Sequence, residues 1–177
     1  MSYNQHAEWL QLIEVSVPFL AEPILKEAFP QGLDEVDSIK RKQFRSTYEE
    51  WQEVTVDRDE EASFKTKIHQ EWIHWVIQQG LEWDENQQAE DLKPLSQLDA
   101  ALSLTVAEHN TEVAPDFALF TEADGKQIPY LLFKSYPAGT SLHELVASDA
   151  WSASPAERMV QLCKHAKVRL AIITNGE

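Results

Sequence analysis

The sequence predicts a mixed α/β chain of the α+β type, with an N-terminal helical extension, on three observations. Apolar residues recur at helical spacing in the first half, they alternate with a period of two after Leu95, and a capped helix then runs into a continuous apolar segment. The predicted core order is therefore α-β-β-β-α-β. The 177 residues are enough for one domain with an extension. We assign the extension to residues 1–62 and the core to residues 63–177.

Three helices are expected before the strands. Residues 6–29 carry a broad apolar stripe that Pro18 and Pro23 interrupt, which predicts two pieces or a kink. Residues 34–53 form a second amphipathic stretch. Ser63 is the expected N-cap of a third helix over residues 63–79, and Gly80 ends it.

Three strands and one hairpin turn are expected next. Residues 83–94 are polar and without a period, which is typical of a loop. Alternation predicts strands at 102–107, 113–120 and 128–136. The Asp-Gly pair at 124–125 favours a tight hairpin turn between the last two of these strands.

The C-terminal part combines a helix start with a strand. Ser154, Pro155 and Glu157 have the spacing of a capping box with proline in the first turn. The apolar run at 168–174 is typical of a strand buried on both faces, and its crossover helix predicts that it lies parallel to an earlier strand. A strand of that kind at this place predicts that the fold continues past Glu177.

Charge and composition narrow the class of protein. Fifteen basic against thirty acidic residues leave a net charge of −15, which argues against a simple basic-patch nucleic-acid binder. The acids gather in residues 48–91, where they indicate a solvated helical face or, alternatively, a surface that docks a basic partner. One cysteine excludes an internal disulfide framework. The lack of a long apolar run and of a signal peptide predicts a cytoplasmic protein without membrane contact.

The predicted hairpin contains the candidate residues for metal binding and catalysis. Pairing across the 124–125 turn sets Asp116 opposite either Phe133 or Lys134, depending on the loop count, and in the second register Asp116 and Lys134 are direct neighbours. A carboxylate there can hold a divalent cation while the lysine orients a water molecule. Glu108, at the end of the preceding strand, is a candidate second oxygen ligand. The alternative is a structural cross-strand ion pair.

These residues resemble the PD-(D/E)XK restriction-endonuclease-like family. Pro115-Asp116 followed by a strand with Lys134, inside the α-β-β-β-α-β order, is similar to that family's metal-dependent nuclease pattern. The resemblance implies Mg²⁺ as cofactor, double-stranded DNA as partner, and Asp116 and Lys134 as catalytic residues. The family's second acid would stand at position 132, where this chain has leucine, so Glu71 and Glu108 are the candidates to replace it.

A second likeness covers most of the chain. The segments 19–23, 48–51, 115–118, 137–140 and 154–159 resemble the N-terminal region of large bacterial adenine-specific DNA methyltransferases of the restriction-modification or phage-defence type. The implied partner is a C-terminal methyltransferase region of the same protein. These 177 residues contain neither the glycine-rich loop nor the Asn-Pro-Pro-Tyr-like motif that methylation needs.

Three classes of function stay open. The first is a metal-dependent endonuclease, and the second is a nuclease-derived domain that positions DNA without cutting it, with Lys40, Arg41 and Lys42 as DNA contacts. The third is a structural interaction domain. Other side chains are interpreted as structural: His69 and His74 as core-edge histidines, Cys163 as a small core residue, and Trp72, Trp75 and Trp83 as packing between helices and sheet.

Overall fold

The computed structural model describes residues 22–32, 37–57, 61–83, 92–145 and 151–177. The chain divides into two compact units, Met1–Lys42 and Gln43–Glu177, and each is described by itself. The first unit holds helix α2, Glu22–Ala28, whose second residue is Pro23. Proline suits the first turn of a helix because the N–H that it lacks would have no partner there. The rest of the helix predicted over 6–29 lies mostly outside the described residues.

Two long helices form one side of the second unit. Helix α3 spans Ser38–Val56, and its larger part from Gln43 on belongs to this unit. Helix α4 spans Ala62–Trp75 and continues into a π-helical turn, η1, at Val76–Gly80. The prediction that Ser63 caps this helix is wrong: the N-cap is Glu61, and the Ser63 hydroxyl donates to the Glu61 carboxylate at 3.3 Å.

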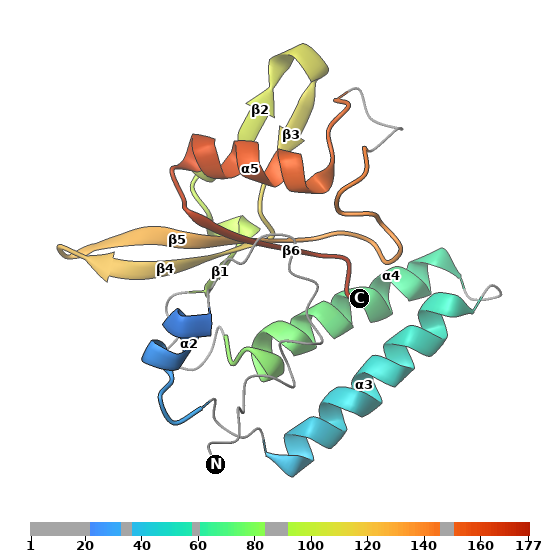
Figure 1. The fold of residues 1–177 in the computed structure, drawn as a ribbon. Helices are drawn as coiled ribbons and strands as arrows, with labels where there is room; N and C mark the ends of the chain where they lie inside the picture. Colours follow the sequence, from blue (N-terminus) through green and yellow to red (C-terminus); the bar gives the residue numbers. More distant parts are fainter. Residues whose placement is uncertain (1–21, 33–36, 58–60, 84–91, 146–150) are drawn as a thin grey trace. The chain divides into compact units, whose positions relative to one another are not determined.

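A four-stranded mixed sheet lies at the centre of the second unit (Figure 1), and no further strand joins it within the described residues. Its strands, in spatial order, are β1 (Leu92–Pro94), β4 (Phe117–Ala123), β5 (Lys126–Ser135) and β6 (Leu170–Thr174). The first two contacts are antiparallel, and β5 pairs with β6 in parallel. The predicted parallel pairing of the last strand is confirmed.

The identity of the first sheet strand differs from the prediction. Strand β1 arises in the segment expected to be a loop, whereas the predicted strand at 102–107 is β2, Leu104–Val106. Strand β2 pairs only with β3, Thr111–Val113, in a separate two-stranded sheet. Alternation of apolar and polar residues indicates that one face of a strand is buried, but it does not indicate which strand lies beside it.

Short turns and prolines set the boundaries of these strands. Turns of 3-10 helix occupy η2 at Leu95–Gln97, η3 at Ala100–Leu102 and η4 at Ala107–His109. The strand predicted over 113–120 is broken into β3 and β4 around Pro115, which has no N–H for a ladder bond.

The predicted helix start at Ser154 is confirmed. Helix α5 spans Pro155–Ala166; the Ser154 hydroxyl accepts from the Glu157 N–H, and the Glu157 carboxylate accepts from the Ser154 N–H. The expectation that the following strand is buried on both faces is wrong: the residues of β6 are exposed or half-buried, and Leu170 is 37% exposed. Within the described residues, β6 lies at one edge of the sheet. A continuous apolar run identifies a strand without telling how far its faces are covered.

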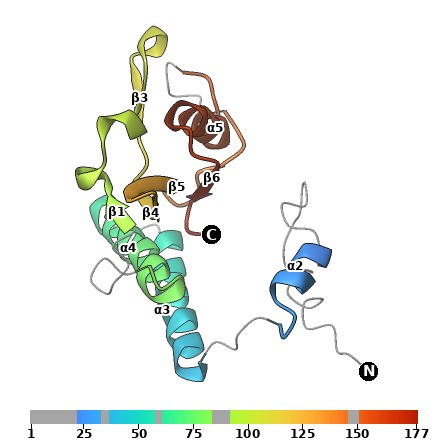
Figure 2. The same cartoon turned by 90° about the vertical axis from the view of Figure 1, so that its left-hand side faces the viewer.

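Two hydrophobic cores lie on opposite faces of the sheet. Helices α3 and α4 cover one face, where Trp51 and Trp72 from the helices form one cluster with Phe133 of β5. Helix α5 covers the other face, where Leu132, Met159 and Leu162 pack with aliphatic neighbours. Figure 2 shows α4 and α5 on either side of the strands. Among the helices of the described ranges, none combines the length and the apolarity that a bilayer span requires.

Candidate functional site

The register of the β4–β5 hairpin decides which residue faces Asp116. The turn at Asp124 and Gly125 has positive φ at both positions (53° and 71°), as a type I′ turn requires, and it sets Ala123 opposite Lys126. A register shift between Leu119 and Phe120 then moves the pairing by one residue. Beyond this bulge Phe117 lies opposite Phe133, which puts Asp116 across from Lys134. The Asp116 N–H donates to the Phe133 carbonyl at 2.8 Å, and the Lys134 ammonium reaches the Asp116 carboxylate.

Proline at position 129 gives the bulge a physical reason. Pro129 lies within β5 opposite Phe120 and has no N–H to donate. Strand β6 begins to pair with β5 only at Leu131, so no ladder on that side is interrupted.

Both oxygens of the Asp116 carboxylate are occupied by donors. The Lys134 ammonium donates to Oδ1 at 2.8 Å, and the Ser135 N–H and hydroxyl each donate to Oδ2 at 2.7 Å. The Asp116 and Lys134 side chains are 27% and 26% exposed, so the pair is half-buried. Charge-assisted bonds in such a setting are stronger than bonds between neutral groups. The second register considered from the sequence is therefore the one present.

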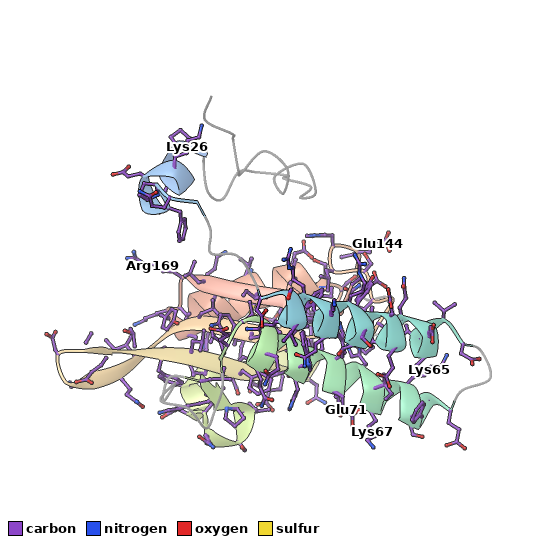
Figure 3. The ribbon with its side chains drawn as sticks, turned by 90° about the horizontal axis from the view of Figure 1, so that it is seen from below. Lys26, Lys65, Lys67, Glu71, Glu144 and Arg169 are labelled. Carbon is purple, nitrogen blue, oxygen red and sulfur yellow. The ribbon has the colours of Figure 1, made fainter. Side chains whose placement is uncertain are left out.

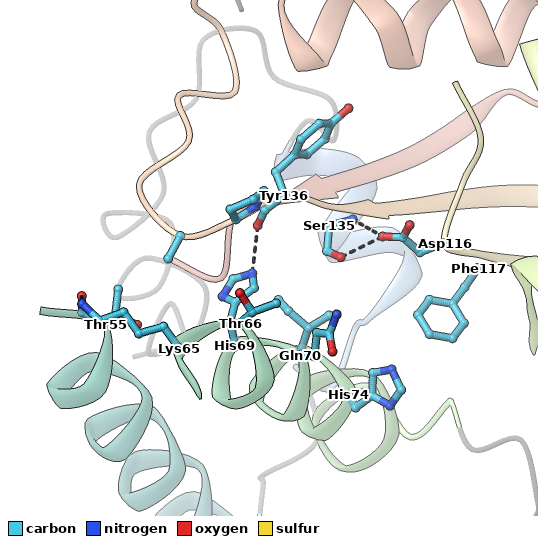
Figure 4. Close-up of a pocket in the computed structure, with 13 residues that line it drawn as sticks. Thr55, Lys65, Thr66, His69, Gln70, His74, Asp116, Phe117, Ser135 and Tyr136 are labelled. Carbon is cyan, nitrogen blue, oxygen red and sulfur yellow. Dashed lines mark hydrogen bonds between the residues drawn. The ribbon is translucent and has the colours of Figure 1, made fainter. Parts of the chain in front are cut away.

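A cavity of about 610 Å³ opens between α4 and the ends of β4 and β5 (Figure 4). Asp116 and Ser135 line it from the sheet, while Lys65, His69 and Gln70 are among the polar residues that line it from α4. Lys134 is not part of the lining. Among the described residues, the lining of the cavity thus includes one carboxylate and one lysine, together with hydroxyl, amide and imidazole groups.

Lys65 is held by backbone acceptors. Its ammonium donates to the Thr55 carbonyl at 3.4 Å and to the Asp57 carbonyl, near the C-terminal end of α3. A cation placed there satisfies helix-terminal carbonyls and complements the negative end of the helix dipole.

His69 is held between two hydrogen-bond partners. The Trp51 indole N–H donates to Nδ1 at 3.1 Å, and Nε2 lies 2.8 Å from the Tyr136 carbonyl oxygen, which can only accept. In this arrangement Nδ1 is the acceptor of the ring and Nε2 is its donor. His69 serves as a bridge between α3, α4 and the end of β5, as expected for a core-edge histidine.

The chain end closes the same aromatic cluster. The Trp72 indole N–H donates to the Gly176 carbonyl at 2.9 Å. Gly176 has φ +87°, and a Cβ at this position would lie 2.8 Å from His69 Cε1 and 3.0 Å from a Trp51 ring carbon. Trp51 and Trp72 are 3% and 4% exposed, which confirms the interpretation of Trp72 as a packing residue.

The two candidate replacements for the missing acid lie away from Asp116. Glu71 is 58% exposed and pairs with Lys67 at 3.7 Å on the outer side of α4 (Figure 3), so it is not part of the cavity lining. Glu108 belongs to η4, at the β2–β3 turn, and is not part of the lining either. Leu132 is fully buried in the α5-side core. The structure therefore brings together Asp116 and Lys134, and neither Glu71 nor Glu108 joins them.

The described residues fit a magnesium ion poorly. Mg²⁺ is usually held through one or two carboxylates, together with waters and substrate phosphates. The cavity has one carboxylate, and it already accepts three hydrogen bonds. In the part of the chain that the structure describes, no three His, Cys, Asp or Glu side chains cluster closely enough to hold a metal ion. We derive no step through a metal.

Two groups of the described residues have shifted pKa values, Tyr136 in this cavity and Cys163 on the opposite face of the sheet. Burial raises the pKa of Tyr136 above its ordinary value of 10.0; the Arg158 guanidinium opposes the shift and the Asp116 charge adds to it. Burial also raises the pKa of the Cys163 thiol on α5, which disfavours the reactive thiolate. Ser135, Gln70 and Tyr136 were not found from the sequence. Only the position of Ser135 and Tyr136 directly after Lys134 could have pointed to them.

The proposed DNA contacts lie in the first unit. Lys40, Arg41 and Lys42 occupy the first turns of α3; Arg41 and Lys42 are exposed and Lys40 is half-buried. In the comparisons with known proteins, no family model, no curated protein and no solved structure matches this chain.

Proposed function

We propose that the chain is a nuclease-like module of a DNA restriction-modification or phage-defence protein, and that it binds its partner without cutting DNA. The order α4-β1-β4-β5-α5-β6 supports the nuclease-like part, with β2 and β3 as an inserted hairpin. The ion pair between Asp116, directly before β4, and Lys134 on β5 also supports it, because these are the two residues to which the family resemblance assigns roles.

One observation carries the non-cutting part of the proposal. Both oxygens of the Asp116 carboxylate accept hydrogen bonds from Lys134 and Ser135. Among the described residues that line the cavity, there is no second carboxylate. Hydrolysis would require Asp116 to leave a half-buried network and to act alone. The network instead ties the start of β4 to the end of β5, which is a structural role.

A nicking assay tests this part. Supercoiled plasmid is incubated with the full chain in Mg²⁺ or Mn²⁺, and the expected nicking equals that of Asp116→Ala and of a protein-free control. Metal-dependent nicking that Asp116→Ala and Lys134→Ala both abolish, while Glu71→Ala retains it, would overturn the proposal. Circular dichroism of each variant separates loss of activity from loss of fold.

DNA binding without cleavage is measured with a labelled duplex. We expect binding that weakens with salt, and the slope of log K against log [salt] should fall by about one for each phosphate contact removed among Lys40, Arg41 and Lys42. A matched neutralisation is Lys126→Gln at the β4–β5 turn, which should leave the slope unchanged. Equal slopes in all variants would contradict the assignment of these residues.

The second candidate is a metal-dependent endonuclease. It is favoured by the adjacency of Asp116 and Lys134 beside a cavity with room for a phosphate group. The nicking assay decides between the two, because only the endonuclease predicts cleavage that depends on both residues.

A further inference from the structure

Strand β6 leaves one edge of the sheet unpaired within the described residues. The Tyr136 N–H donates to the Thr174 carbonyl at 2.8 Å, so alternate residues of β6 direct their N–H and C=O groups toward β5. The backbone groups of Ala171 and Ile173 therefore point away from the sheet. An edge of this kind is a template for another strand.

Strand β6 lacks three of the features that protect edge strands, namely a bulge, a proline and a charge. Its pairing with β5 runs from Leu170 to Thr174 without a register shift, so no bulge interrupts it. Its five residues, Leu-Ala-Ile-Ile-Thr, contain no proline and no charge. The edge is therefore regular and apolar, and Arg169 directly precedes it.

An apolar groove accompanies the edge. A cavity of about 580 Å³ lies between α5 and β6, and its apolar lining includes Met159, Val168 and Ile173. Val160 is 51% exposed beside it. A strand laid along β6 would cover these side chains with every second residue of its own.

The charges around this groove have one sign. Lys164, Lys167 and Arg169 are its charged lining residues, and they lie where α5 ends and β6 begins. All three are exposed, and Figure 3 shows Arg169 at the margin of the ribbon. A cationic site on a chain of net charge −15 favours an acidic ligand at that end.

We propose that β6 and α5 form a docking site for an extended acidic and aliphatic segment of a partner protein, which joins the sheet as an added strand. Its backbone bonds to Ala171 and Ile173, alternate aliphatic side chains enter the groove, and its acidic end meets Lys164, Lys167 and Arg169. Strand addition of this kind takes affinity from main-chain bonds and specificity from side-chain pockets. A nucleic acid could use the cations but would leave the apolar part of the groove uncovered.

Synthetic peptides test the proposal against the full chain. A labelled peptide of about ten residues, the length of a long strand, alternates valine with threonine and carries glutamates at either its N-terminal or its C-terminal end. Fluorescence anisotropy is expected to detect binding of one of the two orientations. The same peptide with lysines in place of glutamates should bind at least about tenfold more weakly, and N-methylation of its bonding face should abolish binding.

Variants of the chain locate the contact. Lys164→Glu combined with Lys167→Glu should weaken the acidic peptide about tenfold, whereas Lys126→Glu, a charge reversal at the hairpin turn, should not. Ala171→Pro removes an outward N–H while keeping the bonds to β5, and should abolish binding with an unchanged circular dichroism spectrum. If Ala171→Pro unfolds the chain, the Lys164→Glu and Lys167→Glu double variant and the N-methylated peptide still test whether the peptide binds along β6.

Equal binding of the acidic and lysine peptides would overturn the proposal, and so would binding that Lys164→Glu with Lys167→Glu leaves unchanged. Self-association of the chain through β6 that blocks all peptides would also overturn it. Preference for a single-stranded oligonucleotide over the acidic peptide is the fourth contradicting result. Asp116→Ala should bind the peptide normally, so the outcome is independent of the nicking and duplex-binding experiments.

Discussion

The cavity beside Asp116 and the groove along β6 lie in the same unit but differ in how their polar groups are hydrogen-bonded. In the cavity, the Asp116 carboxylate and the His69 ring have partners inside the chain, and so does the carbonyl of Gly176, which lies beside His69. In the groove, the outward backbone groups of β6 have no strand beside them among the described residues. Polar groups that are satisfied internally hold a fold together, whereas an unpaired edge with exposed apolar side chains is available to a partner.

This difference predicts that substitutions in the cavity cost stability and that substitutions in the groove cost binding. Substitutions at Gly125, at the hairpin turn, and at Lys164 and Cys163, in the groove, are the controls for substitutions in or beside the cavity.

The largest effect is expected at Gly176. Gly176→Ala must place a Cβ 2.8 Å from His69 Cε1 at a φ of +87°, so we expect the free energy of unfolding to fall by about 2–4 kcal/mol. Gly125→Ala is the matched control, because φ is +71° there but no atom lies within 4 Å of the added Cβ. That variant should lose only about 1 kcal/mol, the strain of a positive φ alone. Urea unfolding measures the free energy of unfolding of both variants. Equal decreases would show that His69 and Trp51 move aside for the added Cβ at little cost.

A smaller effect is expected at Asp116. Asp116→Ala removes three charge-assisted hydrogen bonds from a half-buried carboxylate and leaves Lys134 without its acceptor, at a cost of about 1–2 kcal/mol after allowance for solvent screening. In the groove, Lys164→Ala should change stability by less than about 0.5 kcal/mol. If the two variants were equally stable, the Asp116 network would not have the structural role that we assign to it.

The smallest effect concerns pH. Because burial raises the pKa of Tyr136 in the folded chain, the unfolded chain loses this proton first as the pH rises. The stability from the neutral phenol is therefore complete below about pH 10.0 and is lost as the pH rises through the folded-state pKa. Tyr136→Phe should flatten the alkaline fall of the unfolding free energy. Cys163, on the groove side, has its pKa raised from 9.0 by burial, so Cys163→Ala should flatten an earlier part of the same fall. An unchanged alkaline slope in Tyr136→Phe would contradict the assignment.

The sequence predicted correctly the elements that depend on residues close together in the chain. The capping box at Ser154, the type I′ turn at Asp124 and Gly125, and the parallel last strand follow from caps, turn residues and the crossover helix. The strand at 102–107 was found but assigned to the wrong sheet, and β1 was missed because three residues carry too little periodicity to predict a strand.

The sequence by itself determined a mixed α/β chain, its hairpin, and the presence of an aspartate and a lysine on neighbouring strands. Only the tertiary structure decided that they pair, because a single bulge between Leu119 and Phe120 moves Asp116 from Phe133 to Lys134. It also decided that Glu71 and Glu108 lie elsewhere and that the apolar strand 170–174 is an edge. Spacing along the chain fixes which residues share a face, but distances between elements depend on how register and packing close the sheet.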